Sequence, residues 1–279
     1  YEICACLVGS EMCIRDSKVF YVQGVQVADR KSSDIHPDMA ESKARVYDDL
    51  MCRHWDRWDE GEYRHIFIAE LTSGGIGKGV DIIGEGAEWD TPLAPYFDMS
   101  EIAWAPDGTR LAYTCKPLTG AKYAVSTDSD IFVYDTETGA TTNICKGLTP
   151  ISGHDAAAKT ELPFVGYDKY PVFSPDGNTM YLTGARQSDS SDTGVEILIS
   201  EREEAQWSKP VRLHVFQDST ISCGHPAVSP GGEYLYFTSD YSGGHGGKDL
   251  WRAAITGEGI SAPENLCLLY TSPSPRDMR

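Results

Sequence analysis

The chain has 279 residues, 41% of them hydrophobic and 24% charged, which is ample material for a buried core. Its 42 Asp and Glu residues against 24 Lys and Arg give a formal net charge of -18, which argues against nucleic acid or an anionic membrane surface as a partner. No apolar run reaches the roughly 18 residues that a membrane span needs. The high content of Gly, Pro and Tyr favours a turn-rich β protein over a helical bundle.

The two ends of the chain read as translated DNA adapter rather than as protein sequence. Cys6–Ser17 and Cys267–Asp277 can be encoded by DNA strings that are reverse complements of each other over almost their whole length. Such strings resemble the transposon-end adapters used to prepare sequencing libraries. We therefore expect residues 1–17 and 267–279 to be adapter-derived tails, exclude them from the fold, and expect both native termini to be missing.

The segment from about Pro37 to Trp55 predicts the one helix of the chain. Pro37 suits a first helical turn. Four apolar residues of this segment recur at the spacing of a helix: Val46, Tyr47, Leu50 and Met51. Beyond it, Tyr63–Leu71 followed by 79–83 indicates two strands.

A turn sequence that recurs three times marks three hairpins. Each copy has an apolar strand, a small residue, Pro, and a turn pair ending in Gly, followed by a second apolar strand; the copies are Ile102–Gly108, Pro171–Gly177 and Pro226–Gly232. Pro presets φ at the second turn position and Gly takes the positive φ, so each copy predicts a tight turn. Third strands are expected at 129–134, 195–200 and 248–253, and short fourth strands at 142–144, 210–213 and 264–266.

Four strands per unit are typical of a β-propeller blade. We therefore predict an all-β fold, an incomplete β-propeller of about three to four four-stranded blades with one N-terminal helix. The predicted propeller fragment covers 18–266, with blades at about 62–91, 100–147, 168–214 and 223–266. An inserted loop is expected at 148–167.

Four stretches between about residues 31 and 181 carry a family resemblance: Ser33–Asp38, Tyr47–Asp56, Ala124–Ile131 and Gly166–Gly177. This part resembles the propeller domain of the prolyl oligopeptidase (S9) family of serine peptidases, in its dipeptidyl and acylaminoacyl peptidase branch. The resemblance implies a non-catalytic propeller that gates or binds peptide substrate beside a hydrolase domain. It also implies a periplasmic or secreted parent protein.

The later part of the chain, from about 184 to 266, is similar to another group of propellers. Glu201–Leu213, Leu235–Asp240 and Gly243–Trp251 resemble the WD40-like repeats called PD40, which occur in TolB-like envelope proteins. This resemblance implies the alternative function, a cell-envelope scaffold that binds proteins and performs no chemistry. The two resemblances meet near 174–186, where either a joining of two genes or a genuine mosaic propeller would explain them.

Catalytic chemistry is not expected of this chain. In the family it resembles, catalysis belongs to an α/β-hydrolase domain whose nucleophile needs a strained Gly-x-Ser-x-Gly elbow, and no such elbow occurs here. We therefore predict no peptidase activity for the chain, although the parent protein is expected to be a serine peptidase. No catalytic, cofactor-binding or metal-ligating residue is predicted, and no cofactor.

Several clusters contain residue types that could form a site, but we interpret them as structural. Cys52, Cys115, Cys145 and Cys223 lack metal-ligand spacing, so they are expected to be buried apolar side chains, with a disulfide as the alternative in a periplasmic parent. His54–Trp58 is expected to form an aromatic lid with satisfied polar groups, and Gly74–Gly77 to form a loop. Ser242–Asp249 is expected to be a glycine-rich hairpin loop, with an anion-binding loop as the alternative. Ser126–Asp130 is expected to be polar residues that enter a strand, with a cation site as the alternative.

Overall fold

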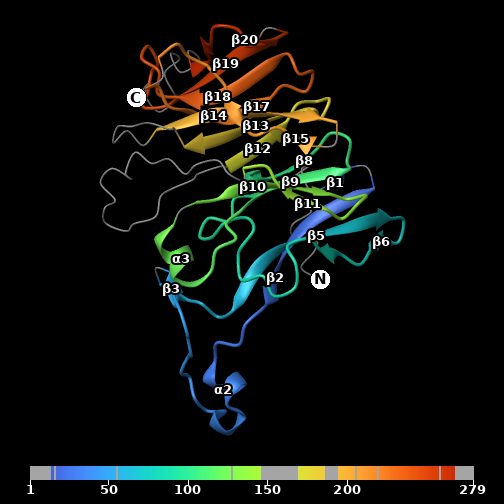
Figure 1. The fold of residues 1–279 in the computed structure, drawn as a ribbon, viewed down its shortest axis with the longest axis vertical. Coiled ribbons are helices and arrows are strands. Elements are labelled where there is room, and N and C mark those ends of the chain that lie inside the picture. Colours follow the sequence, from blue (N-terminus) through green and yellow to red (C-terminus); the bar gives the residue numbers. More distant parts are fainter. Residues whose placement is uncertain are drawn as a thin grey trace, which may run out of the picture.

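Four antiparallel β-sheets, stacked one after another along the long axis of the molecule, make up most of the structure, which is a computed structural model (Figure 1). It describes residues 14–15, 17–54, 56–126, 128–145, 169–185, 194–204, 206–218, 220–257 and 259–267. The inserted loop expected at 148–167 lies outside these residues, as do 1–13 and 268–279 of the expected tails.

The strands of the four sheets follow the chain in order. The first sheet holds β1 (Ile14–Arg15), β2 (Lys18–Gln26), β5 (Glu62–Thr72), β6 (Gly75–Ile76) and β7 (Val80–Asp81). The second holds β8 (Ile102–Trp104), β9 (Arg110–Cys115), β10 (Asp130–Asp135) and β11 (Thr141–Asn143). The third holds β12 (Lys169–Phe173), β13 (Thr179–Ala185), β14 (Val195–Glu203), β15 (Gln206–Trp207) and β16 (Val211–Arg212). The fourth holds β17 (Cys223–Val228), β18 (Tyr234–Ser239), β19 (Asp249–Thr256), β20 (Gly259–Ile260) and β21 (Glu264–Asn265).

Each sheet is built as a propeller blade, with each strand paired antiparallel to its neighbours. The first and fourth sheets lie at opposite ends of the stack, so the described residues form an open array of blades, an incomplete β-propeller (Figure 1). The first sheet includes β2, which the sequence analysis left unassigned and which pairs with β5 across 35 intervening residues, 27–61.

The three predicted hairpin turns are confirmed, and they share one geometry. In each, the turn glycine has a positive φ, 67° at Gly108, 69° at Gly177 and 81° at Gly232. The N–H of each glycine donates to the carbonyl three residues earlier, at 3.0, 2.9 and 2.9 Å. A residue with a Cβ is disfavoured at this φ, which explains why Gly recurs at the same place.

The core lies between the sheets as three apolar layers. Phe20 and Ile66 of the first sheet pack with Ile102 and Leu111 of the second. Further layers join the second sheet to the third and the third to the fourth. Each sheet is therefore held by burial against its neighbours, and this burial favours an unbroken stack.

The helix predicted from Pro37 to Trp55 is wrong. The described part of this segment contains η2 (Pro37–Met39), which is one 3-10 turn, and β3 (Arg53–His54). The short α2 (Ser32–Ile35) precedes the segment, and β4 (Arg57–Trp58), the partner of β3, follows it. The backbone N–H of Val46 donates to the Arg30 carbonyl at 2.8 Å, a contact between chain segments that replaces a helical hydrogen bond. Val46 and Leu50 are exposed, so no surface covers the apolar stripe that would stabilise a helix.

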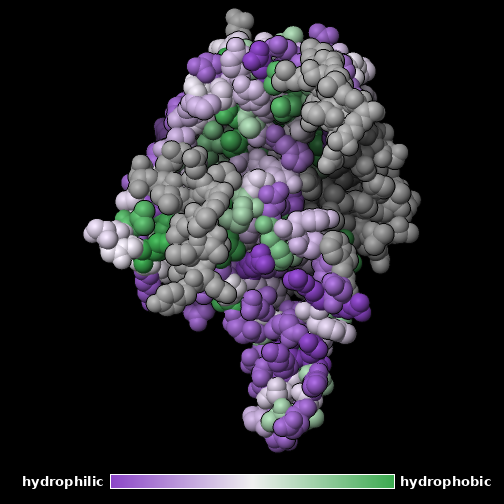
Figure 2. Space-filling model, turned by 180° about the vertical axis from the view of Figure 1, so that it is seen from behind, coloured by the Kyte–Doolittle hydropathy of each residue, from purple (hydrophilic) through white to green (hydrophobic). Residues whose placement is uncertain are grey.

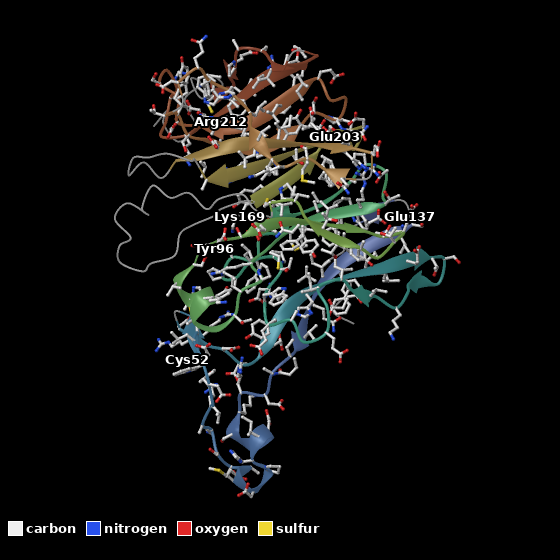
Figure 3. The ribbon with its side chains drawn as sticks, viewed as in Figure 1. Cys52, Tyr96, Glu137, Lys169, Glu203 and Arg212 are labelled. Atoms are coloured by element: carbon white, nitrogen blue, oxygen red, sulfur yellow. The ribbon has the colours of Figure 1, made fainter. Side chains whose placement is uncertain are left out.

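The stack of sheets has two distinct ends. The three tight turns lie at one end, which we call the turn end. The first strands of the sheets begin at the opposite end, which we call the connection end. The segments 27–61, 116–129 and 240–248 leave the sheets at the connection end. Figure 3 shows Lys169 and Tyr96 toward the connection end, and Glu137 and Glu203 toward the turn end. Residues 27–61 project from the stack with α2 near their tip, and this projection is mostly hydrophilic (Figures 1 and 2).

Two further helices also belong to the connection end. The 3-10 helix η3 (Met99–Glu101) leads directly into β8, and α3 (Gly120–Val125) lies in the segment 116–129. Among the described residues, no helix has the length and apolarity needed to cross a membrane.

Candidate functional site

One residue from each of three neighbouring blades stands at the same distance along the chain from its tight turn. Five residues before the proline of each tight turn stand Glu101, Tyr170 and His225. The first strands β8, β12 and β17 lie beside one another, because β12 contacts both of the others. We call these three residues, together with Lys169, the inner-strand row.

The backbone of the row is distorted at two equivalent places. Tyr170 and His225 have φ values of 56° and 54°, in the left-handed region that is uncommon for residues other than Gly. Each lies in a β-bulge, one between Lys169 and Val172 and one between Gly224 and Ala227. Bulges and left-handed residues redirect side chains and are concentrated near functional sites.

The two bulges bring an aromatic pair together across two sheets. The rings of Tyr170 and His225 lie 4.5 Å apart between centroids, with 35° between their planes. The backbone N–H of His225 donates to Thr183 Oγ1 of the third sheet at 2.8 Å. A Cβ on Gly224 would come within 2.9 Å of Thr183 Cγ2, so this close approach requires Gly.

The imidazole of His225 is exposed and has a defined hydrogen-bond partner. Its Nδ1 lies 3.2 Å from Thr238 Oγ1. Partial burial lowers the pKa of His225 below its usual value, positive Lys248 lowers it further, and Asp98 acts in the opposite direction. The uncharged imidazole is therefore favoured at neutral pH.

Glu101 and Lys169 form a buried ion pair beside the aromatic rings. Glu101 is 1% exposed, and Lys169 Nζ donates to its Oε1 at 2.6 Å. The other carboxylate oxygen accepts the backbone N–H of Leu93 at 2.8 Å. Both oxygens are therefore satisfied, which fixes η3 and the start of β12 next to each other.

Other charged and aromatic groups at the connection end pair with one another. The guanidinium carbon of Arg64 lies 3.7 Å from the centroid of the Phe97 ring. The backbone N–H of Arg64 donates to the Asp90 carboxylate at 2.8 Å. Burial raises the pKa of the Asp90 carboxyl. These groups are engaged with each other, whereas in the row Tyr170 is half-buried and His225 is exposed.

The glycine-rich loop at Ser242–Asp249 is occupied by its own carboxylate. The side chain of Asn265 donates to Asp249 at 2.9 Å, and the backbone N–H of His245 donates to the same oxygen. These hydrogen bonds hold the pKa of Asp249 below its usual range. An anion entering this loop would meet that charge, which supports the interpretation as a hairpin loop.

The remaining clusters of the sequence analysis also have internal partners. Asp130 accepts from Asn143 at 2.7 Å, and the backbone N–H of Asp128 donates to Ser126 at 3.0 Å. Gly75–Ile76 forms β6, so the expected loop at Gly74–Gly77 is part of a hairpin. In the described part of the chain, no three His, Cys, Asp or Glu side chains come together as metal ligands could.

The aromatic cluster of the projection is only partly the expected lid. Trp58 is exposed and stacks on Tyr47 with ring centroids 6.2 Å apart. Two cations flank it, Arg45 and Arg53, each 5.8 Å from its ring centroid. Trp55, which completes the expected cluster, lies outside the described residues.

The four cysteines considered in the sequence analysis are free thiols. Cys115, Cys145 and Cys223 are buried, and Cys52 is half-buried. Burial raises the pKa of Cys115 to about 12. This agrees with the interpretation of apolar side chains rather than a disulfide.

The sequence analysis assigned no residue of the inner-strand row to a site. A signal was present, because the three positions share one spacing from the turn proline. The side chains there are acidic, phenolic and imidazole, so a search for repeated residue types does not find them. Only the stacking of the sheets shows that they lie side by side.

Comparison with known proteins points to one group of enzymes. The chain is 35% identical over 178 residues to dipeptidyl-peptidase 5 of Porphyromonas gingivalis, matching 63% of this chain and 23% of the relative. It is 39% identical over 150 residues to dipeptidyl-peptidase 5 of Porphyromonas endodontalis, matching 54% of this chain and 19% of the relative. The chain is therefore similar in sequence to part of dipeptidyl-peptidase 5. It spans less than a quarter of the length of these two relatives, and with its blades it is a peptidase-related β-propeller.

Solved structures with a similar arrangement are more distant. A TolB protein of Agrobacterium tumefaciens has a TM-score of 0.40 at 20% identity, over 73% of this chain and 56% of that chain. A puromycin-hydrolysing peptidase of Mycobacterium tuberculosis has a TM-score of 0.44 at 12% identity, over 91% of this chain and 38% of that chain. No family model matches the chain.

Proposed function

We propose that this chain is a non-catalytic propeller of a dipeptidyl-peptidase-like protein and that it binds peptide at the inner-strand row. The carrying observation is the Tyr170–His225 pair, two rings in tilted contact that are held on bulged backbone at equivalent positions of adjacent blades. The similarity to dipeptidyl-peptidase 5 supports a peptide as the ligand. The acidic net charge argues against nucleic acid.

The chemistry of the row suits a peptide. A flat aromatic surface of this kind packs against apolar or aromatic side chains, and the imidazole adds a polar contact. The buried Glu101–Lys169 pair beside it holds the two first strands in place. In this proposal the row retains substrate, and the chemistry belongs to a hydrolase domain of the parent protein.

A binding measurement tests the proposal. A tetramethylrhodamine-labelled Ala-Phe-Ala-Phe peptide should raise its fluorescence anisotropy on addition of the protein, with a Kd of about 1 mM or tighter. Tyr170→Ala should weaken binding about tenfold through loss of the stacked ring. Tyr234→Ala, an exposed tyrosine at the turn end of the fourth sheet, is the matched control and should bind as the unmodified chain does.

The absence of catalysis and the location of the parent are parts of the same proposal. A fluorogenic dipeptidyl substrate should show no turnover with the purified chain, since the sequence contains no Gly-x-Ser-x-Gly elbow. Turnover that copurifies with the chain refutes this part. We place the parent protein in the periplasm or outside the cell, and its recovery in the cytosolic fraction of producing cells refutes that placement.

A further inference from the structure

The tautomer of His225 follows from the hydrogen bonds around it. The Thr238 hydroxyl has one proton, and it donates to the Gly224 carbonyl at 3.2 Å. A carbonyl oxygen carries no proton, so the hydroxyl is the donor in this contact. The hydroxyl can then only accept from His225 Nδ1, which must carry the imidazole proton.

A neutral ring protonated at Nδ1 has a lone pair at Nε2. His225 is exposed at the connection end, and its ring packs against Tyr170 with 35° between the ring planes, which restricts the plane in which that lone pair lies. We propose that His225 Nε2 accepts a hydrogen bond from an N–H group of the bound peptide. This inference rests on the proposed function and adds to it the polar group that selects the ligand.

The charges that face this imidazole determine how it responds to pH. Lys248 comes from the connection between β18 and β19, and Asp98 comes from the segment before η3. The phenol of Tyr170 and the hydroxyl of Thr238 are the uncharged groups in contact with the ring. Protonation of Nε2 removes the acceptor, so peptide binding is full at pH 8 and is lost as the pH falls below the usual histidine value of about 6.5.

Anisotropy titrations with the labelled Ala-Phe-Ala-Phe peptide at pH 8 and pH 5 test the inference. The unmodified chain should bind about three- to tenfold more weakly at pH 5, which corresponds to one hydrogen bond. His225→Phe keeps a ring to stack on Tyr170 but has no acceptor. It should bind about three- to tenfold more weakly than the unmodified chain at pH 8, with no further loss at pH 5.

A second variant keeps the test informative if His225→Phe fails to fold. Lys248→Gln removes a positive charge without touching the ring stack, so it should move the midpoint of the pH profile to higher pH. Asp98→Asn should move it to lower pH, and Asn retains the ability to cap η3. A purely structural role for His225 would leave the midpoint unchanged in both variants.

Two failures are distinguishable. If the unmodified chain does not bind the peptide at pH 8, the proposed function is refuted and this inference with it. If it binds but neither His225→Phe nor Lys248→Gln changes the affinity or its pH profile, the role of Nε2 alone is refuted.

Discussion

The buried ion pair of the inner-strand row makes a sharp prediction for stability. Lys169→Met removes the cation and leaves the Glu101 carboxylate inside the protein with the backbone N–H of Leu93 as its described donor. The side chains are 2% exposed for Glu101 and 13% for Lys169, so water cannot replace the lost partner. Breaking a buried pair in this way costs about 3 kcal/mol, the lower part of the range for such pairs.

The assay is urea unfolding followed by tryptophan fluorescence. With a denaturant dependence of about 2–3 kcal/mol per molar urea, the midpoint should fall by about 1–1.5 M. Adding Glu101→Gln to Lys169→Met removes the unpaired charge and should recover more than about 1 kcal/mol. Glu264→Gln is the control, because its pair with Arg252 is solvent-exposed and should contribute less than about 1 kcal/mol.

The reasoning is refuted by a small effect. If Lys169→Met lowers the unfolding free energy by no more than the Glu264→Gln control does, Glu101 is hydrated in solution. The row would then lack the rigid support on which its role as a binding site depends.

Three further predictions follow from single contacts. Gly224→Ala places a Cβ within 2.9 Å of Thr183 Cγ2, so it should lower the free energy of unfolding by about 1–3 kcal/mol, measured by urea unfolding; an unchanged midpoint contradicts the close approach of the two sheets. Cys115 is buried and its pKa is raised to about 12, so iodoacetamide at pH 8 should modify Cys52 of the folded protein and leave Cys115 unmodified. Mass spectrometry measures the two modifications, and equal modification of both thiols contradicts the burial of Cys115. The hydrogen bond from Ser174 lowers the pKa of the Asp176 carboxyl. The carboxylate therefore stabilises the fold at pH values above its usual pKa of about 3.8, and this stabilisation is lost as the pH falls below that value. Asp176→Asn should weaken the acid dependence of thermal unfolding between pH 5 and pH 2, and an identical dependence in both proteins argues against the hydrogen bond.

The blades could be predicted from the sequence because their information is local. Pro and Gly at fixed places in the turns 105–110, 174–179 and 229–234 dictate the backbone there, and alternating apolar residues dictate the strands on either side. The pairing of β2 with β5 could not be predicted in this way, since 35 residues separate the two strands. Such pairing depends on long-range packing rather than on neighbouring residues.

The predicted helix failed for a related reason. The spacing of Val46 and Leu50 suits a helix, but a helical stripe is stabilised only when another surface covers it. Here the segment belongs to a projection that leaves both residues exposed, and its backbone bonds to residues 30–32 instead. The absence of a covering surface cannot be read from the periodicity.

The candidate site lay beyond the sequence analysis because its members are unlike one another. Glu101, Tyr170 and His225 share a spacing from the turn proline but no chemistry, and the bulged backbone of Tyr170 and His225 has no obvious signature in the sequence. Their proximity depends on the stacking of three sheets. The spacing from the turn proline is the rule that would find such residues in other blades.

Photo-crosslinking is the most direct test of peptide binding at the inner-strand row. A peptide Ala-Phe-Ala-Phe in which one Phe is replaced by benzoylphenylalanine is irradiated with the protein, and the crosslinked residues are located by mass spectrometry. The account predicts crosslinks within 169–171 and 223–226, and their competition by the unmodified peptide. Crosslinks confined to the turn end, at 105–110, 174–179 or 229–234, would contradict it.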